Sequence, residues 1–232
     1  DQNNSRPKSI GSRWVFKVKS DNSYKARVMG QGWGQEASRD YGNIDSPVYR
    51  IQSVRMVTTV AAEMDLDVIQ LDAQTAFLNA PLKEEVYVPL PLAFEKTGSV
   101  TDVPLVMKLL LSLYDLRQSP QNWWVTMDRY FGEIEFVALK SDRCVYVYIA
   151  KDDGEVTAFV TSKLSKVAVI LTLYLMKRLK MTDLGDVYLV LGMKITWDGK
   201  IGTLSINQSG YTKGILEKFV IDKCNPATTP GN

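Results

Sequence analysis

The sequence predicts a mixed α+β fold, and three observations support this prediction. Segments with the alternating pattern of strands and segments with the helical period follow one another in irregular order, which favours α+β over a doubly wound sheet. The 232 residues are 45% hydrophobic and 23% charged, a profile typical of a globular protein that buries a core. No apolar run reaches the roughly 18 residues that a membrane span requires, so we expect no membrane partner.

The first third of the chain predicts two paired strands, a helix and a short strand. Residues 12–19 alternate and are rich in Val, Phe and Trp, and a turn at 21–23 leads into a second strand at 24–29. A glycine-rich loop follows. Residues 50–64 have apolar residues at helical spacing, which predicts a helix with one buried face. Residues 67–71 form a short apolar strand that ends at Asp72.

The middle of the chain predicts three further strands around a helix. Strands are expected at 85–89 and 105–110, with the longest loop at 95–104 between them. Residues 119–131 read as a helix in which Ser119 is the N-cap and Pro120 the first helical residue. The strand at 145–149 is followed by Lys-Asp-Asp-Gly, which is typical of a hairpin turn.

The remaining elements complete the α+β pattern. Residues 155–159 are the return strand of that hairpin, and the β-branched segment 167–174 predicts a buried strand. The other expected elements are a helix at 175–180, a strand at 187–196, a turn at 197–200, a strand at 203–206 and a helix at 211–219.

The charged and nucleophilic residues restrict the possible chemistry. Histidine is absent, and the two cysteines lie far apart in the sequence. This excludes Ser-His and Cys-His nucleophiles and His-ligated zinc, so any chemistry must rest on carboxylates, with a metal ion. The net charge is only +2, but basic residues gather in the first two strands: Arg13, Lys17, Lys19, Lys25 and Arg27. Such a strand pair is suited to phosphate backbones, and a solvated hairpin face is the alternative.

Six segments resemble the copia family of reverse transcriptases. They are YKARVMGQG at 24–32, LDAQTAFLN at 71–79, SLYDLRQSPQNWW at 112–124, SDRCVYVY at 141–148, MTDLGDVYLVLG at 181–192 and LSINQSGY at 204–211. They occur in the family's order and roughly at its spacing, over nearly the whole chain. The sequence is therefore identified as a member of this family.

The resemblance implies the fingers and palm of a right-hand polymerase. Fingers would comprise 1–66 and part of 81–125, and palm 67–80 and 126–232. It implies a fragment of a larger Pol polyprotein without the RNase H region. The expected partners are an RNA or DNA primer–template and deoxynucleoside triphosphates, and the expected cofactor is Mg²⁺. The implied location is intracellular, either cytoplasmic in a virus-like particle or nuclear.

The resemblance also assigns roles to individual residues. Asp72 matches the first palm carboxylate, which in the family holds catalytic metal ions for in-line nucleotidyl transfer. Phe77 matches the aromatic residue under the incoming sugar, and the pair on the second strand matches the family's grip on the triphosphate. The nucleotide-binding residues implied in this way are Lys25, Arg27, Ala73, Phe77 and Gln118.

The second carboxylate cluster of the family, an Asp-Asp pair after Tyr-Val, has no counterpart in this sequence. Tyr174 matches the tyrosine of that motif, but Leu-Met-Lys-Arg follows it. An alternative alignment equates 159–160 with the start of the motif, and Thr161-Ser162 then follows. Both alignments lack the acidic pair, so we expect a damaged palm sheet and a catalytically inactive domain.

Two other readings remain open. An active polymerase could use Asp152 and Asp153 beside Asp72, although Asp-Asp-Gly is a common surface turn. A non-enzymatic nucleic-acid binder could keep the basic strands and stack bases on Trp123 and Trp124, although an aromatic pair within a helix is more often core.

Overall fold

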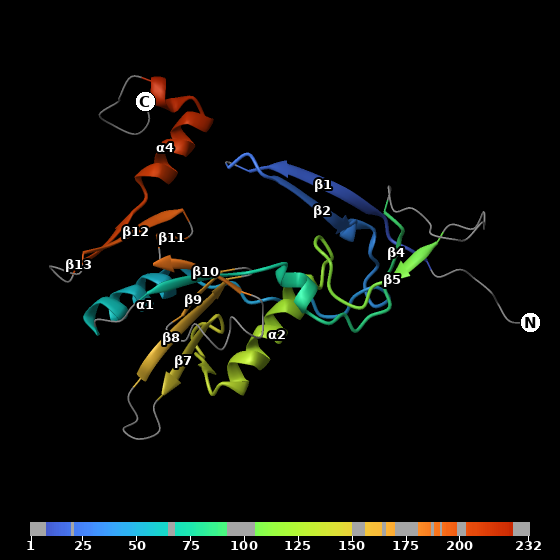
Figure 1. Ribbon diagram of the computed structural model, residues 1–232, viewed down its shortest axis with the longest axis horizontal. Coiled ribbons are helices and arrows are strands. Elements are labelled where there is room, and N and C mark those ends of the chain that lie inside the picture. The colour runs from blue at the N-terminus through green and yellow to red at the C-terminus, as the bar shows by residue number, and fades with distance from the viewer. Residues whose placement is uncertain are drawn as a thin grey trace, which may run out of the picture.

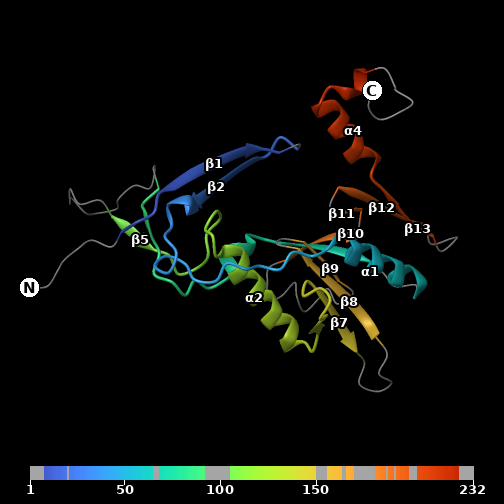
Figure 2. The ribbon, with the colours of Figure 1, turned by 180° about the vertical axis from the view of Figure 1, so that it is seen from behind.

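The protein is described by a computed structural model in which the N-terminal strand pair lies apart from the central sheet and projects from the side of β4 (Tyr87–Pro89) and β5 (Val106–Lys108) (Figure 1). The structure describes residues 8–19, 21–64, 68–91, 105–149, 156–163, 166–169, 181–186, 188–190, 192–198 and 203–224. Strands β1 (Ser12–Val18) and β2 (Tyr24–Gly30) form the predicted antiparallel pair. The view from behind shows the same projecting hairpin (Figure 2).

A six-stranded antiparallel sheet forms the centre of the molecule and carries Asp72. Its strand order is β10-β3-β9-β8-β7-β6. The bounds are Met181–Asp186 for β10, Ile69–Ala73 for β3, Lys166–Val169 for β9, Val156–Lys163 for β8, Val145–Ile149 for β7 and Val137–Ala138 for β6. Strand β3 has a hydrogen-bonded neighbour on each side. The expected damage to the sheet therefore does not leave β3 unpaired.

Helices and two smaller sheets surround this centre, which confirms the mixed α+β class. Strands β4 (Tyr87–Pro89) and β5 (Val106–Lys108) form one pair. The C-terminal sheet contains β11 (Leu189–Val190), β12 (Met193–Asp198) and β13 (Thr203–Asn207). The helices are α1 (Ile51–Glu63), α2 (Ser119–Glu133) and α4 (Ser209–Lys218), with 3-10 turns η1 (Gly32–Gly34), η2 (Ala76–Asn79) and η3 (Ile221–Lys223).

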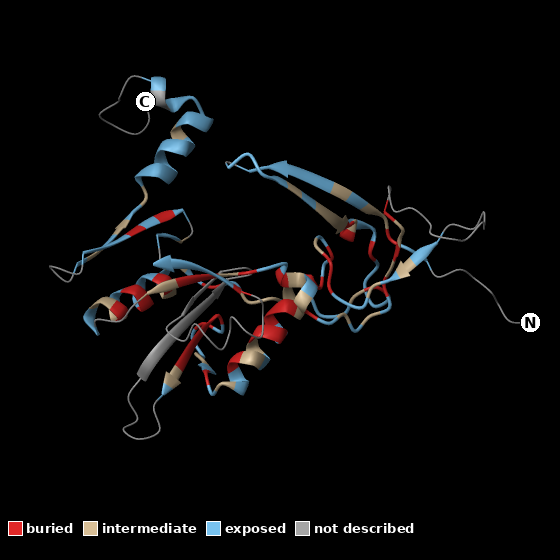
Figure 3. Ribbon diagram, viewed as in Figure 1, coloured by how far each residue is buried: buried red, intermediate tan, exposed pale blue. Residues whose placement is uncertain are grey.

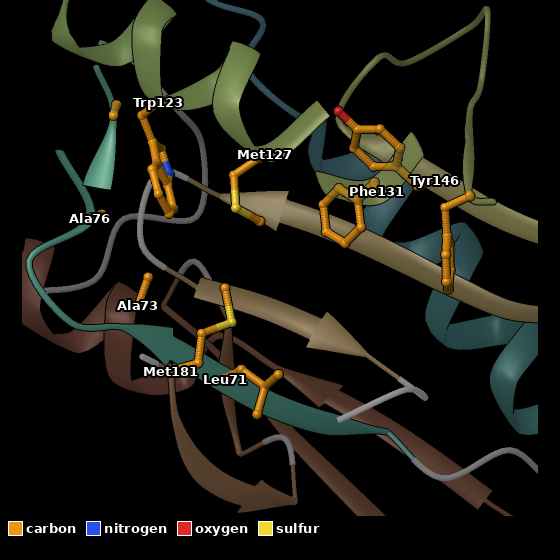
Figure 4. Packing of buried hydrophobic residues seen from close by; sticks show 10 residues of the cluster. Leu71, Ala73, Ala76, Trp123, Met127, Phe131, Tyr146 and Met181 are labelled. Atoms are coloured by element: carbon orange, nitrogen blue, oxygen red, sulfur yellow. The ribbon is translucent and has the colours of Figure 1, made fainter. Parts of the chain in front are cut away.

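The main core lies between α2 and the central sheet. Trp123, Met127 and Phe131 on α2 pack with Leu71 on β3 and Tyr146 on β7 (Figure 4). The Phe131 and Tyr146 rings lie 4.4 Å apart, close enough for favourable aromatic packing. Buried residues gather here, whereas the projecting hairpin and α4 are mostly exposed (Figure 3). The core thus anchors β3, and with it the segment that holds Asp72.

One prediction about the C-terminal third is wrong, and one strand there was not predicted. Residues 187–196 do not form one strand, because β11 and β12 fold back on each other beside Gly192, whose φ is +75°. This φ favours glycine and permits the reversal. The strand β10 was not expected, because its sequence MTDLGD has little β propensity. Its pairing with β3 supplies the backbone hydrogen bonds that override that propensity.

Two local assignments also require correction. The N-cap of α2 is Gln118, and Ser119 instead donates its hydroxyl to the carbonyl of Leu113 at 2.6 Å. Asp72 lies within β3 and not after its end. The expected loop at 95–104, turn at 151–154 and helix at 175–180, with Tyr174, lie wholly or mostly outside the described residues.

Candidate functional site

A pocket of about 620 Å³ lies where β2, β3 and η2 approach the loop that precedes α2. It brings together five of the residues selected from the sequence, although they come from separate segments. The lining residues are Lys25, Arg27, Asp72, Ala73, Gln74, Thr75, Ala76, Phe77 and Tyr114. The volume is in the range typical of small-molecule sites.

Strand β2 presents Lys25 and Arg27 on one face, because side chains two residues apart in a strand point the same way. Both are partly buried and both line the pocket. Desolvation by burial lowers the pKa of Lys25, and the charge of Arg27 lowers it further, while Asp72 opposes the shift. Lys25 is therefore close enough to both Arg27 and Asp72 for their charges to act on its pKa.

Tyr114 connects the basic and aromatic sides of the pocket. The Arg27 guanidinium carbon lies 5.0 Å from the centre of its ring, within the range of a cation–π contact. Phe77 meets the same ring edge-on, with centroids 5.0 Å apart. The aromatic pair therefore forms an apolar wall beside two cations, an arrangement suited to a ligand with both a flat ring and anionic groups.

Asp72 is held by the packing of its neighbours along β3. Leu71 is fully buried and Ala73 is 5% exposed, and both belong to the main core. Because residues alternate along a strand, Asp72 points to the other face and is half-buried in the pocket. Its register partners on the adjacent strands are Lys166 on β9 and Thr182 on β10.

The turn after β3 has an unusual backbone at the rim of the pocket. Thr75 adopts the left-handed conformation, with φ +48° and ψ +48°, which is rare for a β-branched residue. Asn79 stabilises it by donating its side-chain amide to the carbonyls of Gln74 and Thr75, at 2.9 and 3.3 Å. Gln74 in turn donates to the Thr182 hydroxyl at 3.0 Å, which ties the turn to β10.

The donor set of this pocket does not fit a pair of magnesium ions. Asp72 is the one carboxylate among the lining residues that the structure describes, and these described residues include no cluster of three or more possible ligands. The sequence from 156 to 182 contains no Asp or Glu. Two octahedral Mg²⁺ ions need more oxygen ligands than a single carboxylate supplies.

Gln118 lies apart from the pocket. It is fully buried, and its amide accepts a hydrogen bond from Gln35 at 3.0 Å and donates one to the carbonyl of Asp40 at 2.9 Å. These contacts fix the loop before α2, so Gln118 supports the site from behind. Trp123 and Trp124 are also buried, at 2% and 9% exposure, which removes them as a stacking surface.

Two acidic residues and one motif residue selected from the sequence are not part of the described structure. Tyr174, Asp152 and Asp153 all fall outside the described residues. Their expected roles, as a motif remnant and as substitute carboxylates, therefore stay predictions.

Four other lining residues were not predicted from the sequence, namely Gln74, Thr75, Ala76 and Tyr114. Each lies inside a segment that carried the family resemblance, SLYDLRQSP or LDAQTAFLN. The signal for Tyr114 was its aromatic character in a polar loop segment. The left-handed Thr75 gave no signal, because its residue type argues against that backbone.

The comparisons with known proteins all indicate the same protein family. Residues 2–232 match the family model for reverse transcriptase (RNA-dependent DNA polymerase). The chain is 34% identical over 230 residues to the retrovirus-related Pol polyprotein from transposon TNT 1-94 of Nicotiana tabacum, covering 94% of this chain and 17% of the relative. It is 31% identical over 237 residues to the corresponding polyprotein from transposon RE1 of Arabidopsis thaliana, covering 95% of this chain and 16% of the relative.

The chain thus spans about one sixth of the curated relatives it matches. No solved structure matches it significantly. Among the helices of the described residues, none combines the length and the apolar character needed to cross a bilayer.

Proposed function

We propose a function that starts from the family: this chain belongs to the reverse transcriptase (RNA-dependent DNA polymerase) family. In this proposal it is a polymerase domain that retains its nucleotide pocket but no longer catalyses nucleotidyl transfer. In this proposal, Lys25 and Arg27 contact the triphosphate and Phe77 lies beneath the sugar. The domain derives from a copia-type transposon Pol polyprotein, like those named in its relatives.

The composition of the pocket carries the proposal. Four of the five residues that the resemblance assigns to the nucleotide converge with Asp72 in one pocket, and Gln118 does not. Asp72 has no second carboxylate beside it among the described lining residues. Its neighbours in register are a lysine and a threonine. Loss of metal-bound charge stabilisation costs several kcal/mol at the transition state, and each 1.4 kcal/mol is about tenfold in rate.

In this proposal the rest of the chain forms the fingers and palm of a right-hand polymerase. Residues 1–66 and part of 81–125 correspond to fingers, and residues 67–80 and 126–232 to palm. The projecting β1–β2 hairpin, with its basic face toward the pocket, and the α2-backed central sheet support this division.

Primer extension on a poly(rA) template tests the loss of chemistry. Purified protein, shown by circular dichroism to be folded, is assayed with Mg²⁺ or Mn²⁺ beside an Asp72→Ala variant. We expect wild type and variant to be equally inactive. Extension that the variant abolishes would refute the proposal, and Asp152 and Asp153 would be the next residues to substitute.

Binding of nucleic acid without catalysis is a second candidate function, and the β1–β2 hairpin favours it. The register puts Lys17 beside Lys25 and Val15 beside Arg27, so one hairpin face gathers cations. On the other face, Phe16 and Tyr24 are 73% and 88% exposed, and Phe16 stacks on Trp14 at 5.9 Å. The exposed rings on this second face can stack with unpaired bases, and the cations on the first face attract the phosphate backbone.

Fluorescence anisotropy with a labelled primer–template tests this second function. We expect affinity to fall steeply as salt rises, because phosphate contacts release counterions. A Phe16→Ala, Tyr24→Ala variant should weaken the binding, and a Phe219→Ala variant, which removes an exposed ring from the end of α4, should leave it unchanged. Equal affinity for all three proteins would exclude stacking on the hairpin.

A further inference from the structure

The pocket holds more positive than negative charge. Lys25 and Arg27 are partly buried in its wall, and neither has a carboxylate within ion-pair distance in the part of the chain that the structure describes. Arg13, at the other end of the hairpin, by contrast contacts Asp115 at 3.2 Å. Two partly buried cations are stabilised by a nearby anion, and no described residue supplies one within ion-pair distance of Lys25 or Arg27.

The contact that Arg27 makes with Tyr114 leaves its charge available to an anionic partner. Its guanidinium lies over the Tyr114 ring, and no described residue accepts a hydrogen bond from it. This cation–π contact holds the guanidinium beside the Tyr114 ring and uses none of its N–H donors as hydrogen bonds. A planar guanidinium with free donors is well suited to bidentate contact with a phosphate.

The surroundings of Asp72 are unfavourable for a divalent cation. Lys25 interacts with it across the pocket, and Lys166 occupies the directly opposite register position on β9. Lys25 and Asp72 line the same pocket, and the positive charge of Lys25 opposes the approach of a dication to this carboxylate.

We propose that this pocket binds the polyphosphate chain of a nucleoside triphosphate without a divalent metal ion, with Lys25 and Arg27 as the phosphate ligands. The proposal rests on the proposed function for the identity of the ligand. In a two-metal polymerase, dications bridge protein carboxylates and substrate phosphates. Here lysine and arginine provide the positive charge directly, and the Phe77–Tyr114 wall contacts the sugar and base.

This mode of binding reverses the role of Asp72. In a metal-dependent site the carboxylate attracts the ligand through the metal, so its loss weakens binding. In a metal-free site the carboxylate repels the phosphates and competes for Lys25, so its loss strengthens binding. The sign of the effect of Asp72→Asn therefore separates the two modes.

Isothermal titration calorimetry measures the affinity for a non-hydrolysable deoxynucleoside triphosphate analogue and for inorganic tripolyphosphate, in EDTA and in Mg²⁺. We expect binding in EDTA at least as tight as in Mg²⁺. Lys25→Gln and Arg27→Gln should each weaken it by about tenfold. Asp72→Asn should tighten it by about threefold or more, and Lys25→Arg should retain most of it.

Lys17→Gln is the matched control, because Lys17 is the register partner of Lys25 and does not line the pocket. We expect less than about a twofold change from it, since it is exposed. Equal losses for Lys17→Gln and Lys25→Gln would show a general charge effect and overturn the proposal. Binding that requires Mg²⁺ and weakens in Asp72→Asn, or no binding in either buffer, would also overturn it.

The outcome is independent of the extension assay. Metal-dependent binding without extension would refute this inference and leave the proposed function intact. Extension would refute the proposed function, whatever the calorimetry shows.

Discussion

Asp142 is the buried charge on which the packing of α1 depends. It is 8% exposed, and its carboxylate accepts hydrogen bonds from the Ser53 hydroxyl at 2.6 Å and from the backbone N–H groups of Arg50 and Cys144 at 3.0 Å. The first of these N–H groups belongs to the N-cap of α1. Asp142 thus caps a helix far away in sequence, where negative charge is favourable.

The pKa of Asp142 makes this contribution pH-dependent. Burial alone would raise the pKa, but the hydrogen bonds from Ser53, Arg50 and Cys144 outweigh burial and hold the pKa below its ordinary value of 3.8. A carboxyl whose pKa is lowered by folding stabilises the protein above that ordinary value, and the stabilisation is lost as pH falls through the lowered pKa.

We predict that Asp142→Asn lowers the free energy of unfolding by about 1–3 kcal/mol at pH 7, because charge-assisted hydrogen bonds are lost. Urea unfolding of both proteins between pH 7 and pH 3 measures the difference. The gap should close below pH 4. A gap that stays constant with pH would contradict the assigned role of the charge.

Individual pocket residues could be predicted from the sequence where their chemical type, and not the local backbone geometry, determines their role. Lys25, Arg27, Asp72 and Phe77 were identified by residue type and motif, and the pocket unites them. Asp115 has a φ of +72°, a left-handed backbone that glycine adopts most readily and that its residue type alone does not reveal. Gln118 was misplaced because a motif does not reveal whether its amide faces a ligand or a buried neighbour.

At the scale of elements, the loop after β2 and the loop before α2 depend on each other. Gly32 lies so close to the Asp115 carbonyl that a Cβ there would be 2.0 Å from the oxygen. The side chain of Arg117 also donates to the Gly32 carbonyl, at 3.1 Å. These contacts hold Tyr114, the neighbour of Asp115, against Arg27. The packing of two loops therefore sets the shape of the pocket.

We predict that Gly32→Ala lowers the free energy of unfolding by about 1–3 kcal/mol, because the loops must separate to admit the methyl group. Gly34→Ala, two residues away, should change it by less than about 0.5 kcal/mol, since nothing lies within 4 Å of a Cβ there. Thermal unfolding compares the variants. Equal melting temperatures for the two variants would contradict the close approach at Gly32.

Most helices and strands could be predicted from the local sequence pattern, whereas pairing with distant strands determined the others. The strands β1, β2, β7 and β13 and the three described α-helices follow periodicities that are visible in the sequence. β10 forms only because β3 offers a partner. The reversal at Gly192 was hidden because the flanking apolar residues read as one continuous strand.

At the scale of the whole molecule, a second core joins the C-terminal sheet to the centre. Tyr49, Val54 and Cys144 pack with Met193 of β12. Burial, together with the nearby charge of Asp142, raises the pKa of the Cys144 thiol to about 11. Cys144 is therefore protected from thiol reagents as long as the C-terminal sheet stays docked.

We predict that DTNB modifies one thiol in the folded protein and two in urea. Cys224 is exposed and should react first. Cys144 should react at the rate of unfolding, with a Cys224→Ser variant used to isolate its signal. Rapid reaction of Cys144 under native conditions would show that the C-terminal sheet does not pack on the centre.

We propose that this reverse-transcriptase-family pocket binds its nucleotide but lacks, among the described residues, the carboxylates for transfer. Incorporation of a single labelled deoxynucleotide opposite a defined template base measures the transfer step itself. We expect no primer extended by one nucleotide in Mg²⁺ or Mn²⁺ beyond the level seen with Asp72→Ala. Incorporation that depends on Asp72 would contradict it and would require further metal ligands outside the described residues.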